Sequence, residues 1–228
     1  EMLARHTPQA RIRLAMTELG PTFIKLGQIL STRPDVVGRE LADELEHLQS
    51  ETPADSYDLV RATIQAELGQ EVEDLFIEFE GEALASASIG QVHRARLRSG
   101  ERVAVKVQHA GIQERVRVDL DILSGLALLA ERIPEFTNYR PYETAAEFQR
   151  ILLRELDFGR EERHMQEFAH EFETDATIQV PRTFPELSTG RVLTMELLKR
   201  IKLAETTRLI EAGYDLQELA RRGAEVYL

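Results

Sequence analysis

The sequence predicts an α+β fold, in which helices flank a small antiparallel sheet, and three observations support this. Apolar residues recur at helical spacing from the amino terminus to about residue 78, and the period changes to that of strands at about residue 75. Helical patterns return after residue 111 and are interrupted by a second short strand pattern. The resulting order of helices, hairpin, helices, hairpin and helix differs from the regular alternation of a parallel βαβ fold.

The first part of the chain carries four expected helices. They occupy residues 10–19, 21–33, 40–49 and 57–68. Gly20 ends the first of them, and Pro21 suits the first turn of the second, because a proline there loses no hydrogen bond. Gly69 ends the fourth helix, a position that glycine commonly takes.

The predicted strands follow these helices. They occupy residues 75–79 and 91–108, and the second stretch is folded by a turn at 98–101. Alternation with period two places Lys106 and Ala104 on one face of the last strand and the neighbouring valines on the other.

Three more helices are expected beyond the sheet. They occupy residues 111–132, 142–172 and 203–228, and the second is long and highly charged. A final hairpin is expected before the last helix, with strands at 184–187 and 191–196 and a turn at 188–190.

Composition narrows the classes of function. The chain has 28 Lys and Arg against 40 Asp and Glu, a formal net charge of −12, so we expect no nucleic-acid partner. With no cysteine, the chain excludes disulfides, thiol nucleophiles and Cys-ligated metals, and this fits a cytoplasmic location. No apolar run approaches the ~18 residues that a membrane-spanning helix needs. We expect the chain to be a piece of a longer protein, because its last residues, 224–228, still follow a helical pattern.

A loop of small residues, 85–93, leads into the strand pair that carries Lys106. Small side chains let backbone N–H groups approach the phosphates of a ligand, although a plain tight turn has the same composition. Lys106 lies between valines in mid-strand, where a charge is costly unless an anion meets it. A solvated lysine on an edge strand is the alternative. His93 is expected to be a structural hydrogen-bonding residue rather than a metal ligand.

An acidic cluster lies in the long charged helix. Asp157 and Glu161 are four residues apart and share a helix face, whereas Glu155 projects elsewhere. A solvated acidic face is the ordinary alternative for such a cluster.

A polar pair lies in the second helix. Lys25 and Gln28 are three residues apart and share a face, with Gly27 beside them. Because a glycine inside a helix costs about 1 kcal/mol relative to alanine, Gly27 suggests the close approach of another backbone. An incidental exposed lysine and glutamine are the alternative.

Together these motifs resemble the UbiB (AarF) family of atypical, protein-kinase-like proteins. The matching stretches are Lys25-x-Gly-Gln28, the loop ending in Ser88-Ile-Gly-Gln-Val-His93, the strand Val103-Ala-Val-Lys106, and Glu155-x-Asp157. They occur in the order and spacing of the family, and the resemblance covers essentially the whole chain. It implies a kinase-like small lobe, an antiparallel sheet with a long αC-type helix. The implied domains are a helical extension over 1–78, the small lobe over 79–198, and the start of the large lobe over 199–228.

The resemblance also implies a site for ATP or ADP. By analogy with kinases, Lys106 holds the phosphates and Glu161 orients Lys106. The small-residue loop covers the phosphates, and the hinge binds adenine through backbone groups of Glu196 and Leu198. The residues implied for the loop are Ala85, Ser86, Ala87, Ser88 and Gly90. Alanine and serine stand where an ordinary kinase has glycine, so normal protein phosphorylation is not expected.

A lid over this site is implied as well. In the family the helical extension packs over the active site, which places Lys25 near Glu155 or Asp157, with Gln28 close by. The catalytic loop and the metal-binding motif of the family have no match here, so we expect Mg²⁺ ligands mainly beyond Leu228 and no significant activity of this chain alone. Asp157-Phe-Gly159 spells the letters of the metal-binding motif, but it precedes the hinge and is interpreted as a coincidence.

The family supports isoprenoid quinone (ubiquinone) biosynthesis at a membrane, and the resemblance implies that role for the whole protein. Membrane lipid or quinone-biosynthesis proteins are the implied partners, reached through segments outside this chain. A non-catalytic pseudokinase that senses nucleotide or binds a partner is the alternative. A helical scaffold with an incidental hairpin leaves the four ordered motifs unexplained.

Overall fold

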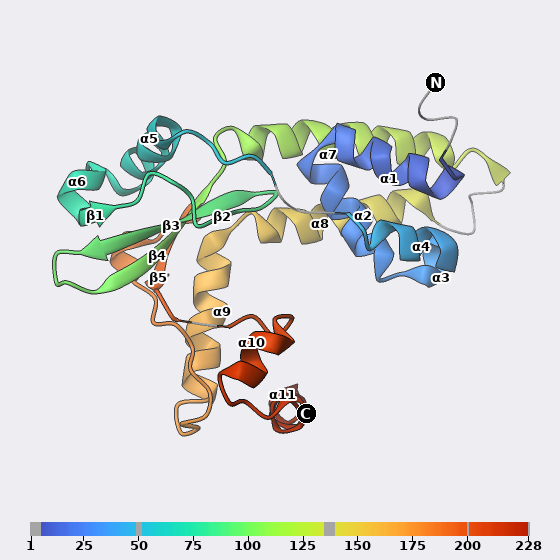
Figure 1. The fold of residues 1–228 in the computed structure, drawn as a ribbon. Coiled ribbons are helices and arrows are strands. Elements are labelled where there is room, and N and C mark those ends of the chain that lie inside the picture. Colours follow the sequence, from blue (N-terminus) through green and yellow to red (C-terminus); the bar gives the residue numbers. More distant parts are fainter. Residues whose placement is uncertain (1–5, 49–51, 135–139, 200, 228) are drawn as a thin grey trace. The chain divides into compact units, whose positions relative to one another are not determined.

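The computed structural model describes residues 6–48, 52–134, 140–199 and 201–227. The chain divides into two compact units, the first ending at Glu196 and the second beginning at Leu197. The first unit contains the sheet and most of the helices (Figure 1). The predicted α+β class is confirmed, with five strands in one antiparallel sheet.

Four helices open the first unit. They are α1 (Pro8–Leu19), α2 (Pro21–Ser31), α3 (Pro34–Val37) and α4 (Arg39–Leu45). Three of them match the predicted segments, while the single-turn α3 after Arg33 was not predicted, and Gln49 lies outside the described residues. Helix α2 is anchored in a small core of Ile24, Leu45 and Leu48.

The sheet is made of β1 (Phe76–Phe79), β2 (Ala85–Ser86), β3 (Gly90–Leu97), β4 (Arg102–Gln108) and β5 (Val192–Glu196). Strands β1, β3, β4 and β5 lie in that order, and β2 also pairs with β3. The turn predicted at 98–101 joins β3 to β4, whereas β2 was not predicted. As the alternation predicted, Val103, Val105 and Val107 are buried, and Lys106 lies on the other face, partly exposed.

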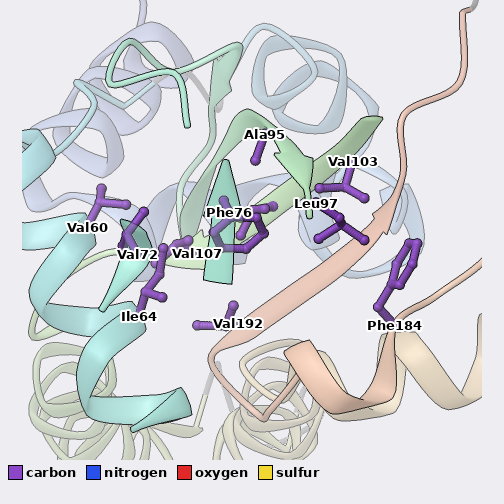
Figure 2. Packing of buried hydrophobic residues seen from close by; sticks show 11 residues of the cluster. Val60, Ile64, Val72, Phe76, Ala95, Leu97, Val103, Val107, Phe184 and Val192 are labelled. Atoms are coloured by element: carbon purple, nitrogen blue, oxygen red, sulfur yellow. The ribbon is translucent and has the colours of Figure 1, made fainter. Parts of the chain in front are cut away.

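Helices α5 (Tyr57–Leu68) and α6 (Val72–Leu75) cover the valine face of this sheet. Val60, Ile64 and Val72 of these helices join the buried cluster with Val107 and Val192 of the sheet (Figure 2). Gly69 ends α5 with a φ of 71°, in the left-handed region, as its position predicted. This packing joins residues 57–75 to the sheet. The division of the chain at residue 78 stays a prediction.

Between β4 and β5 the described chain forms the helices α7 (Ile112–Ala130), α8 (Pro141–Glu155) and α9 (Phe158–Glu171). Helices α7 and α8 pack along each other and α2 contacts both (Figure 1). The prediction of one long helix over 142–172 is wrong, because the chain breaks between Glu155 and Phe158. There Asp157 caps α9 by accepting from the Gly159 N–H, and the Phe158 N–H donates to the Gly190 carbonyl.

The predicted final hairpin is only half correct. Strand β5 forms, but Pro185–Leu187 is a short 3-10 helix, and Thr183 makes only an isolated antiparallel bridge with Met195. Pro185 lacks the N–H that a strand ladder needs, which favours the helical turn.

The second unit carries α10 (Thr206–Glu211) and α11 (Leu216–Tyr227). The single helix predicted for 203–228 is wrong, because Gly213, with a φ of 84°, separates the two. Among the described residues, no helix is long and apolar enough to cross a membrane.

Candidate functional site

Lys106 projects from β4 toward the start of α9. Its Nζ lies 2.5 Å from Oε2 of Glu161 and 4.4 Å from the centre of the Phe158 ring. The lysine side chain is 23% exposed and the glutamate side chain 42%. The carboxylate and the aromatic face together hold a flexible ammonium in one place. The contact predicted between Lys106 and Glu161 is therefore present.

Phe158 is a site residue that the sequence did not reveal. Its side chain is fully buried beneath Lys106, between the start of α9 and the sheet. A Cβ on Gly90 would lie 3.2 Å from Cζ of Phe158 and 2.6 Å from the carbonyl oxygen of Val107. Gly90 is thus needed for close packing at the start of β3. The sequence signal for Phe158 is the stretch Asp157-Phe-Gly159, which has the letters of the metal-binding motif but lies at the start of α9.

The small-residue loop is folded back on itself. The Ala87 N–H donates to the Gly90 carbonyl at 2.9 Å, and the Ala87 carbonyl accepts from Nε2 of His109 at 2.8 Å. Ala87, Ser88 and Gly90 line the same cavity as Lys106. Ala85 and Ser86 instead form β2, paired with β3, and do not belong to the cavity lining.

His93 has a structural role, as predicted. It is fully buried in β3, its Nδ1 contacts the Glu80 carbonyl at 2.8 Å, and its Nε2 lies 2.8 Å from the Gln91 side-chain amide. With Nδ1 as donor and Nε2 as acceptor, a neutral ring satisfies both contacts. Burial lowers the pKa of His93 below its usual value, although the Glu80 carbonyl acts in the opposite sense.

Lys25 of α2 reaches across to the end of α8. Its Nζ lies 2.9 Å from Oε2 of Glu155, so of the two acids considered from the sequence it pairs with Glu155. Asp157 is occupied elsewhere, because it caps α9 and lies 3.5 Å from a guanidinium nitrogen of Arg163. Gln28 lines the same cavity as Lys25, and its Nε2 is 3.4 Å from the Leu48 carbonyl.

Gly27 explains how α2 is seated. A Cβ at this position would overlap Cδ1 of Leu48 and lie 2.8 Å from Sδ of Met16. The prediction of a close approach was right, but the approaching groups are side chains of the neighbouring helical segments and not another backbone.

These residues surround one cavity of about 870 Å³ in the first unit. Its walls come from α2, the small-residue loop, β4, α8 and α9. Its charged lining consists of Lys25, Lys106, Arg154, Glu155, Asp157, Arg160 and Glu161. Both lysines have a carboxylate partner, whereas no ion pair is recorded for Arg154 or Arg160 within the described part of the chain. The cavity therefore suits an anionic ligand.

Comparison with known proteins places the chain in a family. The profile of the ABC1 atypical kinase-like domain matches residues 47–228. The chain belongs to the ABC1 family of atypical kinase-like domains. A "Probable protein kinase UbiB" of Pseudomonas aeruginosa is 39% identical over 222 residues, which are 97% of this chain and 42% of that protein. The resemblance to UbiB proteins drawn from the motifs is confirmed.

The chain is also similar to two other proteins. An uncharacterized Synechocystis protein, sll1770, is 39% identical over 226 residues, 98% of this chain and 39% of that protein. A solved complex of Rv3197 with erythromycin, from Mycobacterium tuberculosis, has a TM-score of 0.57 at 26% identity, covering 81% of this chain and 45% of that one. The chain thus spans about two fifths of the length of the curated relatives it matches.

Gln108 is a second residue that sequence reasoning missed in this ABC1 domain. It is buried at the end of β4, and its side-chain amide donates to the carbonyls of Leu156 and, at 3.1 Å, of Gly190. Its Oε1 accepts from Nε2 of Gln113 at 3.1 Å. Gln108 therefore holds the break between α8 and α9. Its signal was its place two residues after Lys106, on the same face of the strand.

The hinge residues of the ABC1 domain are only partly placed. The Glu196 N–H donates to the Arg182 carbonyl at 2.8 Å, so this group is already occupied. Leu198 belongs to the second unit. The binding of adenine by these two residues stays a prediction.

In the described ranges no three His, Cys, Asp or Glu side chains gather as a metal site. The acids nearest the cavity are occupied by Lys25, Lys106 and the cap of α9. The described residues therefore do not fit Mg²⁺ by themselves.

Proposed function

We propose that this chain is the ATP- or ADP-binding portion of a UbiB-type atypical kinase or ATPase. The observation that carries the proposal is the Lys106–Glu161 pair, 2.5 Å apart in a cavity of about 870 Å³, within a chain of the ABC1 family. A paired lysine beside a loop of small residues is the arrangement that kinases use to hold nucleotide phosphates.

Each part of the cavity has a task in this proposal. Glu161 fixes the direction of the Lys106 ammonium, and the ring of Phe158 supports it from below. Ser88 and Gly90 place loop backbone beside the phosphates. The Ala87 N–H already donates to the Gly90 carbonyl, so this loop offers fewer backbone N–H donors to a phosphate than a loop of glycines.

The Lys25–Glu155 pair is the lid in this proposal. It joins α2 to the end of α8 at the same cavity, where an extended peptide would otherwise enter. Such closure favours nucleotide hydrolysis, or transfer to a small acceptor, over phosphorylation of proteins. For the whole protein we propose a role in isoprenoid quinone biosynthesis, in keeping with the UbiB name of its relatives, with quinone-pathway proteins or membrane lipid as partners.

The test measures the binding of Mg-ADP by isothermal titration calorimetry. It uses the full-length protein that contains this chain. Lys106→Met is expected to weaken binding at least tenfold, because it removes a charge-assisted contact to phosphate. Arg102→Met, on the same strand as Lys106 but outside the cavity lining, is the matched control and should change affinity less than twofold. Equal affinities of the two variants would refute the placement of the phosphates at Lys106.

A turnover measurement separates the two forms of the proposal. Metal-dependent release of phosphate from ATP, lost in Lys106→Met, supports an enzyme. Binding of Mg-ADP without turnover supports a nucleotide-sensing pseudokinase.

A further inference from the structure

His109 ties the small-residue loop to the end of the sheet. It directly follows β4, it is buried, and it does not line the cavity that contains Lys106. Its Nε2 lies 2.8 Å from the Ala87 carbonyl and must donate there, because a carbonyl can only accept. Its backbone N–H donates to the Ile89 carbonyl at 3.2 Å. One buried residue therefore holds two carbonyls of the loop and directs them toward a residue outside the cavity lining.

Asp55 supports the His109 ring from its other edge. Oδ2 of Asp55 lies 3.2 Å from Nδ1 of the ring, although the two atoms are not aligned for a hydrogen bond, and it accepts the Ala110 N–H at 2.9 Å. The buried Gln91 of β3 holds Asp55 in turn. Its Oε1 accepts the Asp55 N–H at 2.6 Å, and its Nε2 donates to the Asp55 carbonyl at 3.3 Å. The ring is thus placed by a network that begins in the sheet, which makes its position precise.

The peptide between Ala87 and Ser88 turns this anchor into a direction for a donor. In a planar trans peptide the carbonyl and the following N–H point in opposite directions, and the described residues contain no cis peptide. With the Ala87 carbonyl held by His109, the Ser88 N–H is turned away from that ring, on the side where Ser88 lines the cavity. Within the described ranges no acceptor is recorded for this N–H. Such a group suits a phosphate oxygen.

We propose that His109, supported by Asp55, is a positioning residue that keeps the Ser88 N–H turned into the cavity as the loop's donor to a nucleotide phosphate. The inference rests on the proposed function, because it concerns the same site. The Ala87 N–H already donates to the Gly90 carbonyl, so the Ser88 N–H is one of the few loop donors left for a ligand. Without the His109 donor, the peptide between residues 87 and 88 is free to rotate, and a phosphate loses this partner.

The test compares variants of the full-length protein that contains this chain, by titration with Mg-ADP and, in competition, with adenosine. His109→Phe keeps a ring but removes the Nε2 donor. It should weaken Mg-ADP binding about tenfold and change adenosine binding less than twofold, because only the phosphates lose a contact. His109→Gln keeps a side-chain N–H for the Ala87 carbonyl and should bind Mg-ADP within about threefold of the unchanged protein. Equal losses for both ligands in His109→Phe would indicate a general structural role and overturn the proposal.

Thr63→Val is the matched control for the loss of a buried donor. Thr63 and His109 are exposed to 7% and 6%, and the Thr63 hydroxyl donates to the Leu59 carbonyl at 3.0 Å, outside the cavity lining. This substitution should change the affinity for Mg-ADP less than twofold. A loss as large as that of His109→Phe would mean that any buried defect weakens binding, and the proposal would fail.

Asp55→Ala tests whether the carboxylate acts through the ring. Alone it should weaken Mg-ADP binding, and in the His109→Phe protein it should add less than a twofold loss, because two residues that act on the same group are not additive. Fully additive losses overturn the role given to Asp55.

Hydrogen–deuterium exchange of residues 87–90 separates this inference from the proposed function. Mg-ADP should slow exchange of the Ser88 amide in the unchanged protein, and it should do so much less in His109→Phe. If the unchanged protein does not bind Mg-ADP, the proposed function is wrong and this inference falls with it. If the unchanged protein binds Mg-ADP without protecting Ser88, or His109→Phe binds equally well, this inference alone is wrong.

Discussion

Replacing Gly27 by alanine tests how the lid helix is seated. In an exposed helix this change stabilises by about 1 kcal/mol, because alanine is the better helix former. At Gly27 the new Cβ would overlap Cδ1 of Leu48 and lie 2.8 Å from Sδ of Met16. Leu48 is 6% exposed and packs with the fully buried Leu45, so it has little room to move. Overpacking of this kind costs roughly 1–3 kcal/mol.

Gly125 provides the matched control. It also lies inside a helix, α7, but a Cβ there would meet nothing within 4 Å. Gly125→Ala should therefore raise the free energy of unfolding by about 0.5–1 kcal/mol, while Gly27→Ala should lower it by up to about 2 kcal/mol. The difference between the two variants removes the helix-propensity contribution and isolates the overpacking cost. Urea unfolding followed by circular dichroism measures both. If Gly27→Ala is as stabilising as Gly125→Ala, the tight seating of α2 is wrong.

Three further predictions concern the interior of the first unit. Gln108→Ala should lower the free energy of unfolding by about 2–4 kcal/mol, because the buried Leu156 carbonyl loses its donor. In the same urea titration the control Gln149→Ala, on α8, should change that free energy by less than about 0.5 kcal/mol. Phe158→Leu should cost about 1–3 kcal/mol through lost volume and the lost contact with Lys106, and should also weaken Mg-ADP binding in calorimetry; unchanged affinity would show that the ring does not position the lysine. Burial lowers the pKa of His93, so the unfolded state binds a proton before the folded state does as the pH falls below about 6.5. The free energy of unfolding should therefore decline by up to about 1.4 kcal/mol per pH unit below that value. Unfolding curves between pH 7 and 5 should show a smaller decline for His93→Gln.

The sheet and its lysine could be predicted because they depend on local alternation. Valines at every second position of β4 must face one side, and this fixes Lys106 on the other. The end of α5 at Gly69 could be predicted for the same reason, because a glycine in the left-handed region ends a helix whatever surrounds it. The contact with Glu161 came instead from the resemblance to a family, because nothing local relates residues 55 positions apart.

Other features depend on contacts that a sequence pattern does not contain. The charged pattern of residues 142–172 continues through Leu156 and Asp157, and the helix breaks there because of Gln108 and Gly190, which come from distant segments. Phe158 looked like one apolar residue in a charged helix, and only its burial beneath Lys106 gives it a role. Gly27 indicated close packing against α2, but a glycine alone does not show whether the approaching group is a side chain or a backbone.

The break between α8 and α9 is what allows two ion pairs at one cavity. Glu155 and Glu161 are six residues apart, and at 100° per residue a continuous helix would separate them by about 120° around its axis. One helix could thus direct only one of them at the cavity. With the break, Glu155 ends α8 and pairs with Lys25, while Glu161 lies in the first turn of α9 and pairs with Lys106. Because Gln108 holds this break and follows Lys106 by two residues, the strand that carries one lysine also sets the direction of the carboxylate that binds the other.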